Sequence, residues 1–152
     1  VVDWEKIWDL KYDNKWKAEI LTVDQFWERV IFCAPQTYMN LSWASVWPLA
    51  QFYKIPAEDI LVLHDEIYFV VGRVAMKKWW SAAWHNWLRS IISKLWTKDF
   101  WRIRIWIGRP ATSNMVADYV LSTFKPNEKE LMDDKFHEIS DFILKFLKDN
   151  EW

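Results

Sequence analysis

In the sequence Asp59-Ile60-Leu61-Val62-Leu63-His64-Asp65-Glu66, a short apolar run leads directly into three polar residues. A continuous apolar run of this length predicts a strand that is buried on both faces, as in α/β proteins. Reactive groups in such sheets gather where strands reach their carboxyl ends. We therefore expect the strand to stop at Leu63 and His64-Asp65-Glu66 to lie at a candidate site.

The rest of the chain alternates between strand-like and helix-like segments. Strands are expected over Trp16–Leu21, Arg29–Ala34, Arg73–Lys77 and Phe100–Ile107, with Asp24 and Gln25 in the turn between the first two. Helical patterns are expected at Val1–Trp8, Leu41–Tyr53 with Ser42 as N-cap, Asn86–Leu95 and Met115–Phe124. A last amphipathic segment, Asn127–Lys148, has an apolar face of Leu131, Phe136, Ile139, Phe142, Ile143 and Phe146. This order predicts an α/β single-domain sandwich with a twisted mixed β-sheet flanked by helices.

Length and composition fit one globular domain. The chain has 152 residues, 52% of them apolar, and needs no disulfide to hold a core. Its single cysteine, Cys33, excludes an internal disulfide, and its three histidines lack metal-ligand spacing, so neither metal nor cofactor is expected. No secretory leader is visible at Val1, and no apolar run approaches the ~18 residues of a membrane helix. The expectation is a cytoplasmic monomer with no membrane partner.

Glycine and tryptophan are abnormal in opposite directions. The chain has 2 glycines and 14 tryptophans, whereas average usage gives roughly 11 glycines in a chain this long. Because the deficit and the excess are similar, we interpret the sequence as engineered or otherwise altered, with tryptophan replacing glycine. Ordinary core positions are expected for Trp4, Trp16 and Trp101. They are not expected for the tryptophans within residues 79–87, because no helix or strand buries so many indoles in so short a segment.

The net charge of −1 conceals two oppositely charged segments. Residues 73–109 carry nine basic residues and one acid, a balance of +8, whereas residues 118–151 carry nine acids and five lysines, a balance of −4. A basic field of this size favours a phosphate-bearing partner, because neutralised phosphates release their counterions. A solvated positive face balanced by the acidic tail is the alternative.

Several short motifs together resemble bacterial peptidyl-tRNA hydrolase. Thr37-Tyr38-Met39-Asn40-Leu41-Ser42, His64-Asp65-Glu66, His85-Asn86 and Arg102-Ile103-Arg104-Ile105-Trp106-Ile107-Gly108-Arg109-Pro110 occur in the order and roughly the spacing of that family. The resemblance extends from about Asn14 to Phe124. It implies attack by water on the ester that joins a peptide to the 3′ ribose of tRNA. The family's base is a histidine in an N-terminal segment resembling Asn-Pro-Gly followed by Thr-Arg-His-Asn, and we expect this chain to lack that segment and the family's first strand.

The resemblance also assigns roles to individual residues. Asp65 matches the aspartate that hydrogen-bonds the family's histidine, and Asn86 matches the asparagine that positions water and the carbonyl oxygen. Asn40 matches the asparagine that holds the peptide backbone, and Tyr38 and His85 join it as substrate-binding residues. Structural alternatives are a strand-end carboxylate for Asp65 and helix caps for the two asparagines.

The acceptor stem of tRNA is the second partner that the resemblance implies. Its phosphates are expected at Lys77 and Arg104, with Arg89 and Arg109 as weaker additions, and unpartnered surface charge is the alternative for each. A non-catalytic RNA-binding relative, similar to plant organelle splicing factors of this fold, and an inert engineered scaffold are the alternatives to an enzyme.

The family has glycine at several positions that hold tryptophan here. Trp43 and Trp106 stand at two of them, and the glycine-rich lid contains Trp79, Trp80, Trp84 and Trp87. Glycine admits positive φ, and a side chain in that conformation costs roughly 1–2 kcal/mol. We therefore expect strain at these six positions.

Overall fold

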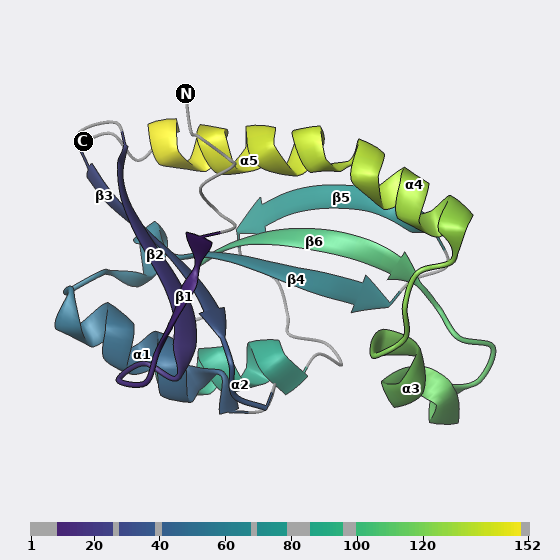
Figure 1. Cartoon of the computed structure of the whole chain (residues 1–152), viewed down its shortest axis with the longest axis horizontal. Coiled ribbons are helices and arrows are strands. Elements are labelled where there is room, and N and C mark those ends of the chain that lie inside the picture. Colours follow the sequence, from purple (N-terminus) through teal and green to yellow (C-terminus); the bar gives the residue numbers. More distant parts are fainter. Residues whose placement is uncertain are drawn as a thin grey trace. The chain divides into compact units, whose positions relative to one another are not determined.

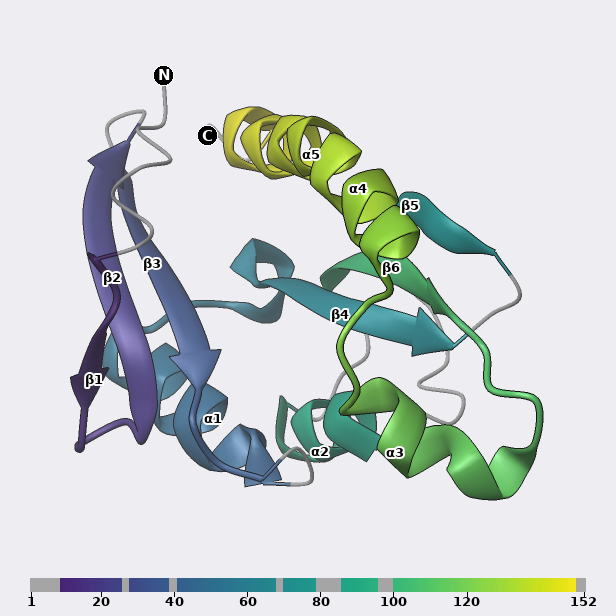
Figure 2. The same ribbon diagram turned by 45° about the vertical axis from the view of Figure 1, so that its right-hand side comes forward.

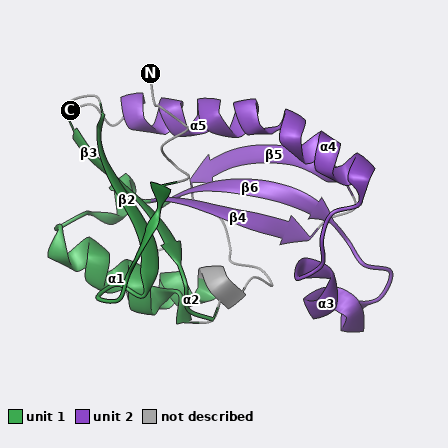
Figure 3. Ribbon diagram, viewed as in Figure 1, with its two compact units in different colours: residues 1–60, 79–100, 150–152 green, residues 61–78, 101–149 purple. Residues whose placement is uncertain are grey.

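A computed structural model describes residues 9–25, 28–38, 41–67, 70–78, 86–95 and 100–149. The chain divides into two compact units (Figure 3). The first contains residues 1–60, 79–100 and 150–152, and the second contains residues 61–78 and 101–149. No helix in the described part of the chain is long and apolar enough to cross a membrane.

The first unit is built on an antiparallel sheet in the order β1-β2-β3 (Figure 1). Its strands are β1 (Lys11–Asp13), β2 (Ala18–Gln25) and β3 (Glu28–Pro35). The prediction that Asp24 and Gln25 form a turn was wrong, because the pairing of β2 with β3 continues to Gln25 opposite Glu28. Two helices complete the unit: α1 (Trp43–Phe52) packs against β3 and against α2 (Asn86–Leu95).

The core of the first unit confirms one of the expected tryptophans. Trp16, Ala18 and Leu49 are buried together, and Cys33 lies against them. Burial raises the pKa of the Cys33 thiol to about 11, so the reactive thiolate is rare at neutral pH. Ser42 is the N-cap of α1, as predicted, although its side chain makes no capping hydrogen bond.

The second unit holds a mixed sheet in the order β4-β6-β5. In Figure 1, β6 (Trp101–Gly108) lies between β4 (Leu61–Ile67), which is parallel to it, and β5 (Val71–Lys78), which is antiparallel. The predicted end of the first strand at Leu63 was wrong. Pairing with β6 continues to Glu66 opposite Trp106, so His64-Asp65-Glu66 lies inside the second half of β4. Residue Asp59 belongs instead to the preceding 3-10 turn, η3 (Ala57–Asp59).

Helices follow the mixed sheet in the second unit. The 3-10 turn η4 (Ser113–Met115) leads into α3 (Val116–Val120), which is shorter than expected. The predicted long amphipathic segment is two helices, α4 (Pro126–Asp134) and α5 (Phe136–Asp149), which lie along β5 (Figure 2). Ile143 and Phe146 on the expected apolar face are buried, but Leu131 and Phe136 are 48% and 49% exposed.

The α/β class and the mixed sheet are confirmed, with one difference in strand arrangement. The described strands form two three-stranded sheets rather than one, because β1, β2 and β3 pair only with each other. The prediction of a single domain stays a prediction, as does the missing N-terminal segment.

The described tryptophans are not in the strained conformation that we expected. Trp43 is helical and Trp106 is extended, and the non-glycine residues with positive φ among those described are Lys17 and Lys54. The expected left-handed strain at Trp43 and Trp106 was therefore wrong. Trp101 is half-buried rather than part of the core. Trp4 and the lid tryptophans lie outside the residues whose side chains are described.

Candidate functional site

An ion pair joins β4 to β6 at the centre of the predicted site. His64 is opposite Arg104 and Glu66 is opposite Trp106 in the parallel register, so these side chains share one face of the sheet. Arg104 Nη2 donates to Glu66 Oε1 at 3.0 Å, and Arg104 Nε donates to Glu66 Oε2 at 3.3 Å. This two-pronged geometry is the strong form of the arginine–carboxylate pair.

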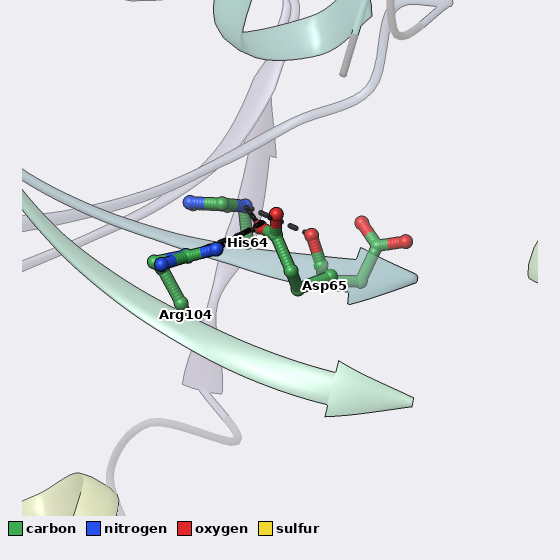
Figure 4. A network of polar contacts seen from close by, with 4 residues as sticks. His64, Asp65 and Arg104 are labelled. Atoms are coloured by element: carbon green, nitrogen blue, oxygen red, sulfur yellow. Dashed lines mark hydrogen bonds and ion pairs between the residues drawn. The ribbon is translucent and has the colours of Figure 1, made fainter. Parts of the chain in front are cut away.

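His64 is part of the same buried network (Figure 4). Its Nδ1 lies 2.8 Å from the backbone oxygen of Asp65 and 3.7 Å from Glu66 Oε2. A carbonyl oxygen only accepts, so Nδ1 carries the hydrogen. The His64 side chain is 2% exposed, which places it among the structural groups rather than the groups that meet solvent.

Arginines flank the buried indole of Trp106. The guanidinium of Arg104 lies 4.7 Å from the ring centroid and that of Arg73 lies 5.0 Å from it. Arg102, two residues before Arg104 on β6, is fully buried. Its pKa is lowered by burial and by the charge of Arg104, and the charge of Glu66 opposes that shift. The Glu66 carboxylate therefore offsets two neighbouring arginines.

The predicted phosphate-binding residues differ in exposure. Lys77 is exposed on β5 opposite Arg102, Arg109 is exposed just after β6, and Arg89 is exposed on α2. Arg104 is only 8% exposed and is held by Glu66. All four assignments to tRNA stay predictions.

Asp65 contributes its backbone oxygen to the buried network, whereas its carboxylate points elsewhere. Side chains alternate along a strand, so Asp65 faces away from His64 and Glu66. Figure 4 shows its carboxylate pointing away from His64 and Arg104. It is half-buried in the carboxyl half of β4, beside Ile105 of β6.

The other predicted substrate residues are only partly covered by the structure. Tyr38 is 83% exposed, and Asn86 is the first residue of α2 as expected. The side chain of Asn86, and all of Asn40 and His85, lie outside the described residues. The predicted convergence of Asn40, Asp65 and Asn86 stays a prediction.

Sequence reasoning missed the part that Glu66 plays. The available signals were the alternation of His64 and Glu66 on one strand and of Arg102 and Arg104 on another, but these combine only when the two strands are known to be parallel neighbours. In the described part of the chain, no three His, Cys, Asp or Glu side chains form a group that could hold a metal ion.

Comparisons with known proteins place this chain in a family. The chain matches the family model for peptidyl-tRNA hydrolase over residues 3–151. It is 41% identical over 137 residues to the peptidyl-tRNA hydrolase of Bdellovibrio bacteriovorus, covering 90% of this chain and 73% of that protein. It is 39% identical over 128 residues to that of Desulfitobacterium hafniense, covering 83% and 69%.

Solved structures agree. The crystal structure of peptidyl-tRNA hydrolase from Acinetobacter baumannii superimposes with a TM-score of 0.77 at 36% identity. The match covers 82% of this chain and 63% of that one, so the chain spans less than two thirds of the solved protein.

The exchange of glycine for tryptophan has a direct test. A codon that the source organism assigns to glycine, but that another genetic code assigns to tryptophan, would leave 2 glycines and 14 tryptophans in the translated sequence. We expect the polypeptide isolated from its source to be lighter than this sequence by the Trp–Gly mass difference at each exchanged position. Peptide mass spectrometry across residues 79–87 checks the lid positions. Masses equal to those of this sequence would show that the codons at these positions are read as tryptophan.

Proposed function

Because the chain belongs to the peptidyl-tRNA hydrolase family, we propose that it cleaves the ester between a peptide and the 3′ ribose of tRNA, as a cytoplasmic monomer. The reaction needs a base for the attacking water, a group that orients the base, and donors for the oxyanion. The position of Asp65 is the observation that carries the assignment to this chain's own residues.

Asp65 is the proposed orienting group. A carboxylate that accepts the imidazole N–H fixes the tautomer of a histidine base and stabilises the imidazolium that forms. Support comes from its place in the carboxyl half of β4 and from the division of labour with Glu66, which holds Arg104. His64 is not the base, because its side chain is 2% exposed.

The remaining polar residues take substrate roles in this proposal. Asn86 positions the water and the developing oxyanion. Asn40, Tyr38 and His85 hold the peptide, and the exposure of Tyr38, 83%, suits contact with a ligand.

Cations of the 73–109 segment bind the acceptor stem in this proposal. Lys77, Arg89 and Arg109 contact phosphates directly, since all three are exposed. Arg104 is the fourth proposed contact, and Glu66 holds its guanidinium in place. Each lost phosphate contact reduces the slope of log affinity against log salt concentration by about one. Lys77→Ala should therefore make tRNA affinity less sensitive to salt.

The test measures peptide release from peptidyl-tRNA. The protein used is the polypeptide as its source organism makes it, with the residues that the source reads at the tryptophan positions. Asp65→Asn should lower kcat/KM about tenfold to a hundredfold, because general-base catalysis of this kind contributes about 10²-fold or more. Asp59→Asn, a change of the same type at an exposed position just before β4, should leave the rate unchanged.

Two results would contradict the proposal. Equal rates for the Asp65→Asn and Asp59→Asn variants would remove Asp65 from its role. Salt-sensitive tRNA binding without any peptide release would favour the non-catalytic RNA-binding relative instead.

A further inference from the structure

An exposed group of aromatic and lysine side chains lies in the first unit and contains none of the site residues assigned above. It joins the turn between β1 and β2 to the end of α1. We call it the aromatic–lysine patch, and its members are Lys15, Trp16, Lys17, Phe52, Tyr53 and Lys54. Among its rings, Phe52 is 58% exposed and Tyr53 is 39% exposed, so two neighbouring aromatic side chains present apolar surface to solvent.

The rings form an ordered platform. Trp16 is buried beneath them at 6% exposure, with its ring centroid 5.4 Å from that of Phe52 in an edge contact. Phe52 and Tyr53 are 4.9 Å apart with their planes at 80°. The Nζ atom of Lys15 lies 3.8 Å from the Phe52 centroid and 4.4 Å from the Trp16 centroid. A cation is therefore held directly over the half-exposed Phe52 ring.

The two other lysines occupy costly backbone conformations. Lys17 and Lys54 have φ of 51° and 55°, in the left-handed region where glycine is the ordinary residue. Lys54 follows the end of α1, and the next residue, Ile55, donates its backbone N–H to Ala50 O at 2.8 Å, a helix ending that usually takes glycine. Lys17 is fixed by its own carbonyl, which accepts from the backbone N–H of Gln36 at 2.9 Å and from Ser45 Oγ at 3.0 Å.

Backbone strain of this kind clusters at functional sites, which makes the patch a candidate site. The patch places Lys15 over the rings, and Lys17 and Lys54 are exposed next to Trp16 and Tyr53 in the sequence. The Asp13 carboxylate accepts the Lys15 backbone N–H at 2.9 Å. Exposed rings stack on unpaired bases, and adjacent cations bind the phosphates between them. We propose that the aromatic–lysine patch binds an unpaired segment of RNA. The proposal stands apart from ester hydrolysis, because it uses none of the residues assigned to that reaction.

Fluorescence anisotropy with a labelled single-stranded adenylate oligonucleotide of about ten nucleotides tests the stacking. Phe52→Ala should weaken binding about fivefold or more, the effect of losing one base stack. Phe136→Ala is the matched control, because Phe136 is also half-exposed, at 49%, but belongs to the second unit. Equal affinity for the Phe52→Ala and Phe136→Ala variants would overturn the proposal.

The lysines allow a second test that separates binding from a structural role. Lys17→Gly and Lys54→Gly should each raise Tm by about 2–4 °C, because each relieves left-handed strain, and should each lower RNA affinity about twofold to fivefold. Lys145→Gly, in the exposed part of α5, should lower Tm and leave affinity unchanged. Higher Tm with unchanged RNA affinity at both patch positions would show that the lysines do not bind RNA. Equal weakening toward a duplex of the same length would exclude base stacking.

Discussion

Glu66→Ala is expected to lower the free energy of unfolding by about 3 kcal/mol, because it removes one partner of a buried ion pair. The Arg104 and Glu66 side chains are 10% and 18% exposed, so little water is present to solvate the remaining guanidinium. Arg102 beside it is fully buried and also loses the neighbouring negative charge. Urea unfolding monitored by tryptophan fluorescence gives the measurement.

An ion pair of similar length but greater exposure provides the control. Lys135 Nζ lies 2.8 Å from Glu138 Oε2, but these side chains are 37% and 39% exposed. Glu138→Ala should therefore cost less than about 1 kcal/mol. Equal free energies of unfolding for the Glu66→Ala and Glu138→Ala variants would show that the Glu66–Arg104 pair is no more shielded from water than the Lys135–Glu138 pair.

A double variant separates the pair from its surroundings. Glu66→Leu with Arg104→Met replaces both charges by apolar side chains, and such replacements are often neutral or stabilising. We expect the double variant to be more stable than Glu66→Ala. The coupling between the partners is the difference between the effect of the double variant and the summed effects of Glu66→Leu and Arg104→Met measured separately. Coupling near zero would show that the Glu66–Arg104 contact itself adds no net stability.

How far the sequence predicted the fold follows from which contacts are local. Asn86–Leu95 was predicted with the bounds of α2, because its 3.6-residue pattern is set within the helix itself. The end of β4 was not predictable in the same way. His64 and Glu66 are polar, yet they continue the strand because Arg104 and Trp106 stand opposite them on β6, a contact across about 40 residues of sequence that the local pattern does not contain.

What the sequence indicated about the candidate site divides in the same way, between local and long-range information. Its motifs identified the family, which the comparisons confirm, since motif order depends only on sequence. To predict the partner of Arg104, one needs the register of two parallel strands. To predict which side chains of α4 are buried, one needs to know which of them the sheet covers. Leu131 was placed on the apolar face from the sequence pattern alone, and in the structure it is 48% exposed.

Gly108→Ala is expected to cost about 3 kcal/mol in unfolding free energy, from left-handed strain and overpacking together. Both glycines of this chain, Gly72 and Gly108, have positive φ, at 83° and 93°. A methyl group on Gly108 would also overlap the hydroxyl of Tyr119 and press on Val71. That hydroxyl is not easily moved, because it donates to the backbone oxygen of Ile107 at 2.8 Å.

Gly72→Ala separates the two causes. The nearest atom to its added methyl group would be Leu131 Cβ at 3.5 Å, an ordinary contact, so only the conformational cost of about 1–2 kcal/mol applies. Tyr119→Phe alone removes one hydrogen bond, worth about 1 kcal/mol. Combined with Gly108→Ala, it should cost less than the sum of the two changes, since the overlapping oxygen is gone. Strict additivity in thermal unfolding would mean that the overlap contributes nothing.

Gly108 pairs with Ile67 at the end of β4 and precedes Arg109, so its replacement should also lower peptidyl-tRNA hydrolysis while the folded fraction stays high.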